Sequence, residues 1–255
     1  MTAQNDTPHN ELESSLIAGA MDQAARPRFY ETLLRSQVLV VPIGEAPTVV
    51  DGLLQGDTKL SFSTIEIDGK YHVPFFSSES RLPSGTTFIR LSAVDFFKIT
   101  SGSHLILNPG SNYGKVFFSH EVASLLNGSL FQPTETLTAT GGERQLIGQP
   151  KDYPHDFSDA VSRFLSSEPG VEKAFLALHF IADVHTEPTI LVAIIAPEVG
   201  FERMAAAIGV IAKETSKAEW AVDVIRLQEN QLGYFSDQAP IYERKKKGLF
   251  AKFFG

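Results

Sequence analysis

The second half of the chain alternates strand-like and helix-like apolar patterns, and this alternation constrains the fold more than any other feature. Continuous or alternating apolar residues indicate strands, and apolar residues three and four positions apart indicate helices. The pattern reads strand, helix, strand, strand, helix, strand over residues 144–147, 157–165, 171–182, 189–195, 201–212 and 220–227. This βαββαβ order predicts two helices on one face of an antiparallel sheet, the ferredoxin-like arrangement, for residues 144–243.

The first half of the chain opens with two predicted helices. Asn10 suits a helix N-cap, and Glu13 three residues later resembles a capping box. Pro27 suits the first turn of a second helix. We expect residues 1–9 to be a disordered tail and residues 10–130 to form the first domain.

The rest of this first domain mixes strands with short helices. Asp68-Gly69 separates two strand-like runs and predicts a type I′ hairpin that returns through residues 70–77. Residues 131–143 contain turn formers without a sustained period, which is typical of a linker. The expected fold class is therefore α+β, with a mixed α/β N-terminal domain before the ferredoxin-like C-terminal domain.

Composition excludes several functional classes. With 43% apolar and 20% charged residues, the chain can bury enough surface to fold as two domains. Its net charge of −8 repels nucleic acid, and it contains no cysteine for disulfides, thiolate zinc sites or Cys nucleophiles. The N-terminal residues lack the pattern of a secretory signal, and no apolar run approaches the ~18 residues that span a bilayer. We expect a cytoplasmic protein.

The last twelve residues, 244–255, form a cationic and Phe-rich tail on an acidic chain. They contain five of the 22 Lys and Arg residues and no Asp or Glu, so residues 1–243 carry 17 basic against 30 acidic side chains, a net charge of −13. A helix would gather the apolar residues into one stripe beside basic residues. The partner-binding candidates here are Lys245, Lys246, Lys247, Leu249, Phe250, Phe253 and Phe254.

So short a segment is not stable as a helix alone in water. Its order has to come from another protein, from an anionic membrane surface, or from the protein's own body. A frayed or self-packed terminus is the alternative.

Two positions in the first domain are further binding candidates. Pro74 cannot donate a ladder hydrogen bond, so we expect its strand at a sheet edge or with a bulge. Phe75 and Phe76 then point to opposite faces, and one of them is available to a partner unless both are buried. The turn that begins at Asn108 could hold a ligand through backbone amides, but it needs none to form.

No residue cluster predicts a reaction, a metal or a cofactor. His179 and His185 lie near Asp183 and Glu187, but without a fixed ligand spacing. Residues 110–115 (GSNYGK) differ from a phosphate-binding loop in glycine spacing, and there is no GxSxG motif. We therefore do not expect an enzyme.

Several short motifs, in this order and spacing, resemble the enhanced serine sensitivity protein family, SseB. They are residues 10–13 (NELE), Arg26-Pro27, residues 73–76 (VPFF), residues 107–109 (LNP), residues 148–150 (GQP), Tyr153-Pro154, residues 240–242 (PIY) and the Lys-rich and Phe-rich end. The resemblance implies an N-terminal and a C-terminal SseB domain in a bacterial cytoplasmic protein linked to serine tolerance. It implies no catalytic residues.

These observations favour a non-enzymatic interaction or regulatory protein that acts through the edge strand and the tail. Its partner would be another protein or peptide, or an anionic membrane surface. The alternative is a small-ligand sensor that binds an amino acid through an ACT-like C-terminal domain, an analogy that rests on the βαββαβ order.

Overall fold

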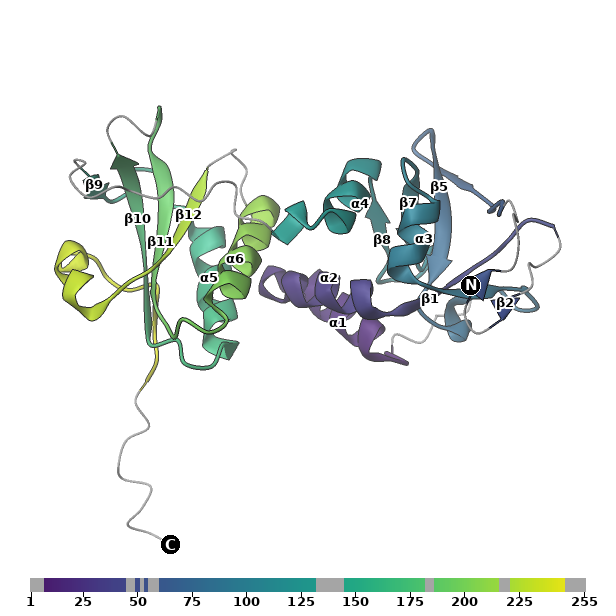
Figure 1. The fold of residues 1–255 in the computed structure, drawn as a ribbon, viewed down its shortest axis with the longest axis horizontal. Coiled ribbons are helices and arrows are strands. Elements are labelled where there is room, and N and C mark those ends of the chain that lie inside the picture. Colours follow the sequence, from purple (N-terminus) through teal and green to yellow (C-terminus); the bar gives the residue numbers. More distant parts are fainter. Residues whose placement is uncertain are drawn as a thin grey trace, which may run out of the picture. The chain divides into compact units, whose positions relative to one another are not determined.

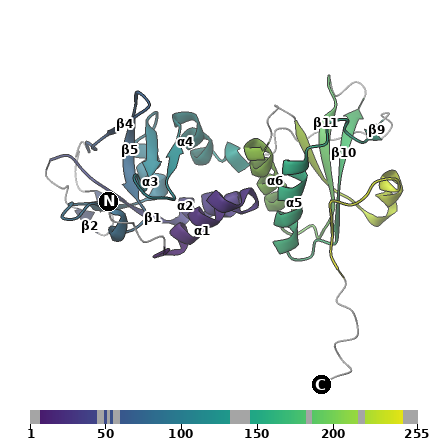
Figure 2. The ribbon, with the colours of Figure 1, turned by 180° about the vertical axis from the view of Figure 1, so that it is seen from behind.

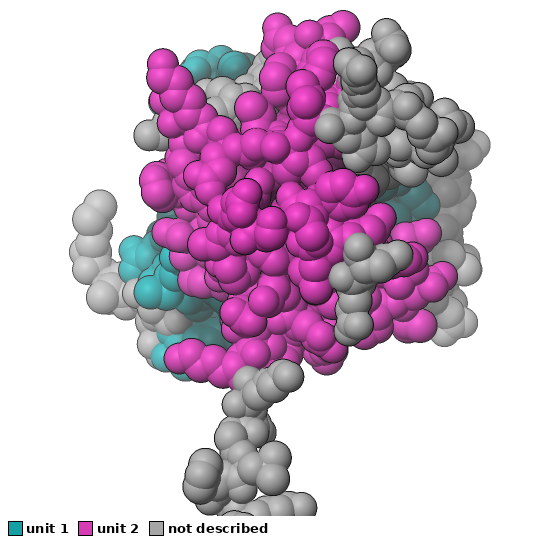
Figure 3. Space-filling model, turned by 90° about the vertical axis from the view of Figure 1, so that its left-hand side faces the viewer, with its two compact units in different colours: residues 1–130 teal, residues 131–255 magenta. Residues whose placement is uncertain are grey.

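The computed structural model describes residues 7–44, 49–50, 53–54, 60–131, 145–181, 186–215 and 221–245. The chain divides between Leu130 and Phe131 into two compact units, each described here by itself. Figure 1 labels their helices and strands, and Figure 3 colours the two units separately. The predicted linker at residues 131–143 and the tail beyond Lys245 lie almost wholly outside the described residues.

Unit 1 combines short helices with a mixed sheet. Its elements are α1 (Glu11–Met21), η1 (Gln23–Ala25), α2 (Arg26–Arg35), β1 (Gln37–Val40), β2 (Val49–Val50), β3 (Leu53–Leu54), β4 (Ile65–Ile67), β5 (Lys70–Phe76), η2 (Glu79–Arg81), β6 (Ile89–Ser92), α3 (Ala93–Ile99), β7 (His104–Leu107), β8 (Lys115–Phe117), α4 (Ser119–Leu126) and η3 (Ser129–Phe131). The strand order is β6-β1-β5-β7-β8, and β4 pairs with β5. Helices α1 and α2 pack along each other (Figures 1 and 2).

The local signals in unit 1 predict its turns and caps well. Asn10 caps α1 by accepting a hydrogen bond from the Glu13 N–H at 2.9 Å. In a capping box the Glu13 carboxylate would accept a hydrogen bond from the Asn10 N–H. Here it accepts from the N–H of the preceding residue, His9. Asp68 and Gly69 both have positive φ, at 50° and 74°, which confirms the predicted type I′ hairpin between β4 and β5.

The prediction that residues 70–77 form an edge strand is wrong. β5 lies in the interior of the sheet, paired with β1 and β4 on one side and with β7 on the other. The Asn108 N–H donates to the Phe75 carbonyl, so Phe75 presents its backbone to β7 and Pro74 faces the opposite side. On that side β4 pairs only as far as His72, and the pairing with β1 starts at Phe75, which lies opposite Val40, the last residue of β1. Pro74 therefore lies between two partner strands, where its missing N–H breaks no ladder bond.

An aromatic cluster forms the core of unit 1. The Phe75 ring lies 5.2 Å from that of Phe96, 5.9 Å from that of Phe97 and 5.8 Å from that of Phe117, between ring centroids. All four side chains are fully buried. The core thus joins β5 and β8 to α3, and Phe29 extends it to α2.

Unit 2 places helices on one face of its sheet. Its elements are β9 (Gln145–Gly148), α5 (His155–Ser167), β10 (Lys173–Ile181), β11 (Thr189–Ile195), α6 (Phe201–Thr215), β12 (Val222–Arg226), η4 (Glu229–Phe235) and β13 (Tyr242–Glu243). Helices α5 and α6 cover one face, and the η4 segment lies against the other (Figures 1 and 2). On the η4 face Phe235 stacks on Phe175, with 5.1 Å between ring centroids.

The chain order βαββαβ occurs in unit 2, but the ferredoxin-like sheet does not. The observed order is β12-β11-β10-β13, and β9 pairs with β10. A ferredoxin-like sheet would place β9 beside β11, whereas β11 pairs with β10 and, in parallel, with β12. The helix α6 connects the parallel strands β11 and β12, as a βαβ unit requires. This topology removes the analogy that suggested an ACT-like sensor.

In the part of the chain that the structure describes, no helix is long and apolar enough to cross a membrane.

Candidate functional site

A buried polar network centres on Glu13, in the first turn of α1. Ser77 Oγ and Ser78 Oγ donate to one Glu13 carboxylate oxygen at 2.7 and 2.6 Å. Arg81 Nη2 and the His9 backbone N–H donate to the other, each at 3.0 Å. The Glu13 and Arg81 side chains are only 2% and 5% exposed, so they form a buried ion pair whose carboxylate is fully hydrogen-bonded.

These bonds determine the protonation state of Glu13. Burial alone raises the pKa of a carboxyl group, because it disfavours the charged form. The hydrogen bonds from Arg81, Ser78, Ser77 and His9 outweigh burial and lower the pKa of Glu13 from its ordinary 4.5 to about 2. Glu13 is therefore a permanent anion at neutral pH, with no free lone pair to accept a proton from a substrate.

Asn108 extends the network to the far end of β7. Its side-chain oxygen accepts from the Ser77 N–H at 2.9 Å, and its amide donates to Ser77 Oγ at 2.8 Å. Its backbone has a φ of 50°, in the left-handed region that Asn tolerates better than most residues. Gly114 packs against it so closely that an added Cβ would lie 3.0 Å from the Asn108 carbonyl oxygen.

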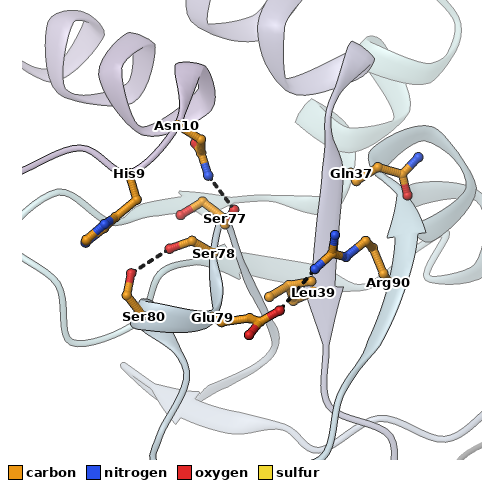
Figure 4. Close-up of a pocket in the computed structure, with 9 residues that line it drawn as sticks. All are labelled: His9, Asn10, Gln37, Leu39, Ser77, Ser78, Glu79, Ser80 and Arg90. Carbon is orange, nitrogen blue, oxygen red and sulfur yellow. Dashed lines mark hydrogen bonds and ion pairs between the residues drawn. The ribbon is translucent and has the colours of Figure 1, made fainter.

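A pocket of about 430 Å³ opens beside this network, at the start of α1 (Figure 4). The residues that line it come from the ends of α1, β1, β5 and β6 and from η2: His9, Asn10, Gln37, Leu39, Ser77, Ser78, Glu79, Ser80 and Arg90. Asn10 Nδ2 donates to the Ser77 carbonyl at 2.8 Å, and Arg90 pairs with Glu79 at 3.1 Å. Most of the lining residues are polar, and the charges of Arg90 and Glu79 neutralise each other.

In unit 2, Arg244 fixes the chain immediately before the cationic tail. Its guanidinium donates from Nε to the Val171 carbonyl and from Nη2 to the Glu168 carbonyl, both at 2.6 Å. Its backbone N–H donates to the Glu172 carbonyl at 2.8 Å. The Glu168 carbonyl lies at the C-cap of α5, where a cation is favoured at the negative end of the helix dipole.

Further contacts complete this anchor of the tail. The Glu168 carboxylate pairs with Arg203 of α6. Lys173 Nζ pairs with Glu243 at 2.8 Å, between β10 and β13. Arg244 was predicted to belong to the tail at 244–255, but its side chain is part of unit 2. Arg244 and Lys245 are both exposed, and Lys245 is the last residue that the structure describes.

The structure buries the candidates predicted in unit 1. Phe75 is fully buried and Phe76 is 4% exposed, so the arrangement with both rings inside the protein is the observed one. Asn108 is buried and uses its side chain within the protein. The candidates Lys246, Lys247, Leu249, Phe250, Phe253 and Phe254 lie outside the described residues.

Of the predicted histidine and acidic cluster, the structure describes only His179 and Glu187, and His179 contacts a different carboxylate. His179 Nδ1 lies 3.7 Å from Asp223 Oδ2, to which Thr189 Oγ1 donates at 2.6 Å. Asp183 and His185 lie outside the described residues. Among the residues with described positions, no three His, Asp or Glu side chains form a group that could hold a metal ion.

Sequence reasoning missed the Glu13 network, because its members are far apart in the chain. Glu13 and Arg81 are separated by 68 positions, and Ser77 and Asn108 by 31. The available signal was their place in three of the motifs that suggest the family: residues 10–13, 73–76 and 107–109. The network joins the ends of these motifs or the residues that follow them.

Comparisons with known proteins confirm the family resemblance. The SseB protein N-terminal domain family matches residues 12–124, and the SseB protein C-terminal domain family matches residues 139–244. Protein SseB of Escherichia coli (strain K12) and Protein SseB of Shigella flexneri are each 27% identical to the chain over 260 residues, which cover 96% of both sequences. No solved structure matches the chain. Together, the two domain matches and the full-length similarity show that the chain belongs to the SseB family.

Proposed function

We propose that this protein is a non-enzymatic interaction protein of the cytoplasm, which binds another protein through residues 245–255. The observation that carries the proposal is the anchor made by Arg244. Three hydrogen bonds tie this residue to the chain that follows α5, so the cationic, Phe-rich tail starts from a fixed point on unit 2.

The chemistry of the tail supports a protein partner with an acidic rim and an apolar groove. Lys245, Lys246 and Lys247 are followed by Leu249, Phe250, Phe253 and Phe254. Aromatic side chains give the largest gains when they are buried in a partner's pocket, and lysines favour an acidic rim. An effect on serine tolerance, which the family resemblance implies, would then act through the partner.

The perturbed carboxylate of Glu13 also supports a role without chemistry. Four donors saturate Glu13, and its low pKa keeps it ionised at neutral pH. A group used as a general acid or base needs a pKa near the working pH and a free position for the proton. Glu13 therefore acts as a structural residue.

The test is an affinity purification from the native host with three forms of the protein. Deletion of residues 246–255 removes the tail but keeps Arg244 and Lys245, so the anchor stays intact. A second variant, F250A/F253A/F254A, keeps every positive charge. We expect the partner captured by the wild type to be lost from both variants, and equal capture by all three forms would contradict the proposal.

Sedimentation with vesicles tests the membrane alternative. If the tail acts on lipid, wild-type protein will sediment with anionic vesicles, and deletion of residues 246–255 or added salt will release it. The protein-partner proposal predicts no sedimentation at physiological salt. Tail-dependent sedimentation without a captured protein would replace the proposal with a membrane role.

A further inference from the structure

His104, at the start of β7, supplies the cap of helix α4. The Ser119 N–H, in the first turn of α4, donates to His104 Nδ1 at 3.0 Å. Phe118 occupies the N-cap position and provides no side-chain hydrogen bond. A helix start leaves N–H groups without partners inside the helix, and a side-chain acceptor satisfies one of them. Here the acceptor comes from 15 positions earlier in the chain.

This hydrogen bond requires a neutral imidazole. A backbone N–H can only donate, so Nδ1 of His104 has to accept, and the ring proton then lies on Nε2. A protonated imidazole carries hydrogen on both nitrogens and cannot accept from Ser119. The added positive charge would also face the positive end of the α4 dipole.

We propose that His104 is a proton-sensitive cap, which holds the first turn of α4 when neutral and releases it when protonated. This inference concerns unit 1 and is independent of the partner proposed above.

The groups around His104 add to the sensitivity. The His72 ring of β5 lies 5.5 Å from the His104 ring, between centroids, and its Nδ1 donates to the Lys70 carbonyl at 3.0 Å. On the other side the Phe118 ring lies 5.6 Å from His104. The Lys70 ammonium lies 5.4 Å from the centroid of the Phe118 ring, and the His120 ring stacks on Phe118 with 5.9 Å between centroids. Protonation of His104 would therefore add a positive charge beside His72 and near a Phe118 ring that already contacts Lys70 and His120, while the carboxylate in the first turn of α4, Glu121, is engaged by Tyr30 and Lys115.

Helix α4 passes the effect on to the core of unit 1. Its Glu121 accepts from the Tyr30 hydroxyl at 2.9 Å and pairs with Lys115 at 3.0 Å, so it joins α4 to α2 and β8. Val122 and Leu125 of the same helix are buried. Loss of the cap thus reaches contacts that hold α4 against its neighbours.

The sign of the effect follows from linkage. The capped state binds no proton at His104, while the uncapped state can bind one, so acid favours the uncapped state. The cap is therefore favoured at higher pH and is weakened as the pH falls.

Two substitutions of His104 distinguish the role of its hydrogen-bond acceptor from the role of its titratable ring. In His104→Asn, the side-chain oxygen can take the place of Nδ1 as an acceptor that does not titrate. In His104→Gln, the amide reaches the position of Nε2 and leaves the Ser119 N–H without a partner. His120→Gln, at an exposed neighbour in the same ring stack, is the matched control.

The measurements are the Ser119 amide proton shift and the hydrogen exchange of residues 122–126 at pH 7.5 and 5.5, corrected for intrinsic exchange. In the wild type and in His120→Gln we expect the Ser119 resonance to move with pH and exchange to become about fivefold faster at pH 5.5. His104→Asn should stay protected at both pH values, and His104→Gln should exchange fast at both. A wild-type Ser119 shift that does not move with pH, or the same acid response in His104→Asn, would overturn the proposal.

Discussion

At the scale of single residues, Glu13 shows how a hydrogen-bonded carboxylate ties the start of a helix to a distant turn. Its four donors are His9 just before α1, Ser77 and Ser78 just after β5, and Arg81 of η2. Because the carboxylate and the Arg81 guanidinium are both buried, either one alone would be an uncompensated charge inside the protein.

Because of Glu13, we expect the stability of unit 1 to vary with pH in the acid range. The pKa of Glu13 is depressed in the folded protein, from 4.5 to about 2, so its contribution is complete above pH 4.5 and declines as the pH falls toward 2. A shift of this size corresponds to about 3 kcal/mol of unfolding free energy. Urea unfolding of wild type and Glu13→Gln at pH 6 and pH 2.5 checks this. We expect the variant to be about 3 kcal/mol less stable at pH 6, and the difference to shrink at pH 2.5; a constant difference would refute it.

Asn108 combines an unusual backbone with two buried side-chain bonds. Asn108→Gly removes only the bonds to Ser77, whereas Asn108→Ala also places a Cβ on a backbone with a φ of 50°. We expect the Ala variant to be less stable than the Gly variant by about 1 kcal/mol. Chemical denaturation of both measures the difference, and equal stabilities would show that the backbone is not strained.

At the scale of elements, the turn from α5 to β10 depends on a glycine. Gly170 has a φ of 80°, and a Cβ added there would lie 2.7 Å from Pro197 Cγ. Gly170→Ala should therefore cost about 2 kcal/mol or more, from strain and overlap together. In the double variant G170A/P197A the overlap is gone but the strain remains, so we expect partial rescue in thermal unfolding. Purely additive effects would contradict the close contact.

The packing of whole elements also explains the order of the strands in each sheet. A strand's period of two specifies which side chains share a face, but not which strands become its neighbours. β5 is placed inside the sheet because Phe75 is buried among Phe96, Phe97 and Phe117. β12 lies beside β11 because α6 crosses over one face of the sheet between them.

At the scale of the whole molecule, each compact unit has its own core. The boundary between Leu130 and Phe131 lies between the two family matches, which cover residues 12–124 and 139–244. We expect two unfolding transitions in calorimetry of the full chain, with Glu13→Gln lowering one and Gly170→Ala lowering the other. Separate chains of residues 1–131 and 145–245 should reproduce these transitions. A single transition lowered by both substitutions would show that the units fold together.

The sequence alone determined features that depend on residues a few positions apart. The Asn10 cap, the Asp68-Gly69 hairpin and the helical periods of α5 and α6 are of this kind, since a cap, a turn or an amphipathic face is completed within one or two turns of chain. The division into two halves and the family resemblance also follow from motif order along the chain.

Which distant segments meet became known from the three-dimensional arrangement alone. It placed β5 in the sheet interior, set β9 against β10, and joined Glu13 to Arg81 and Ser77 to Asn108. It also assigned Arg244 to the anchor of the tail and His104 to the cap of α4. These outcomes depend on burial and on hydrogen-bond partners that come from different elements, and local patterns carry no information about such partners.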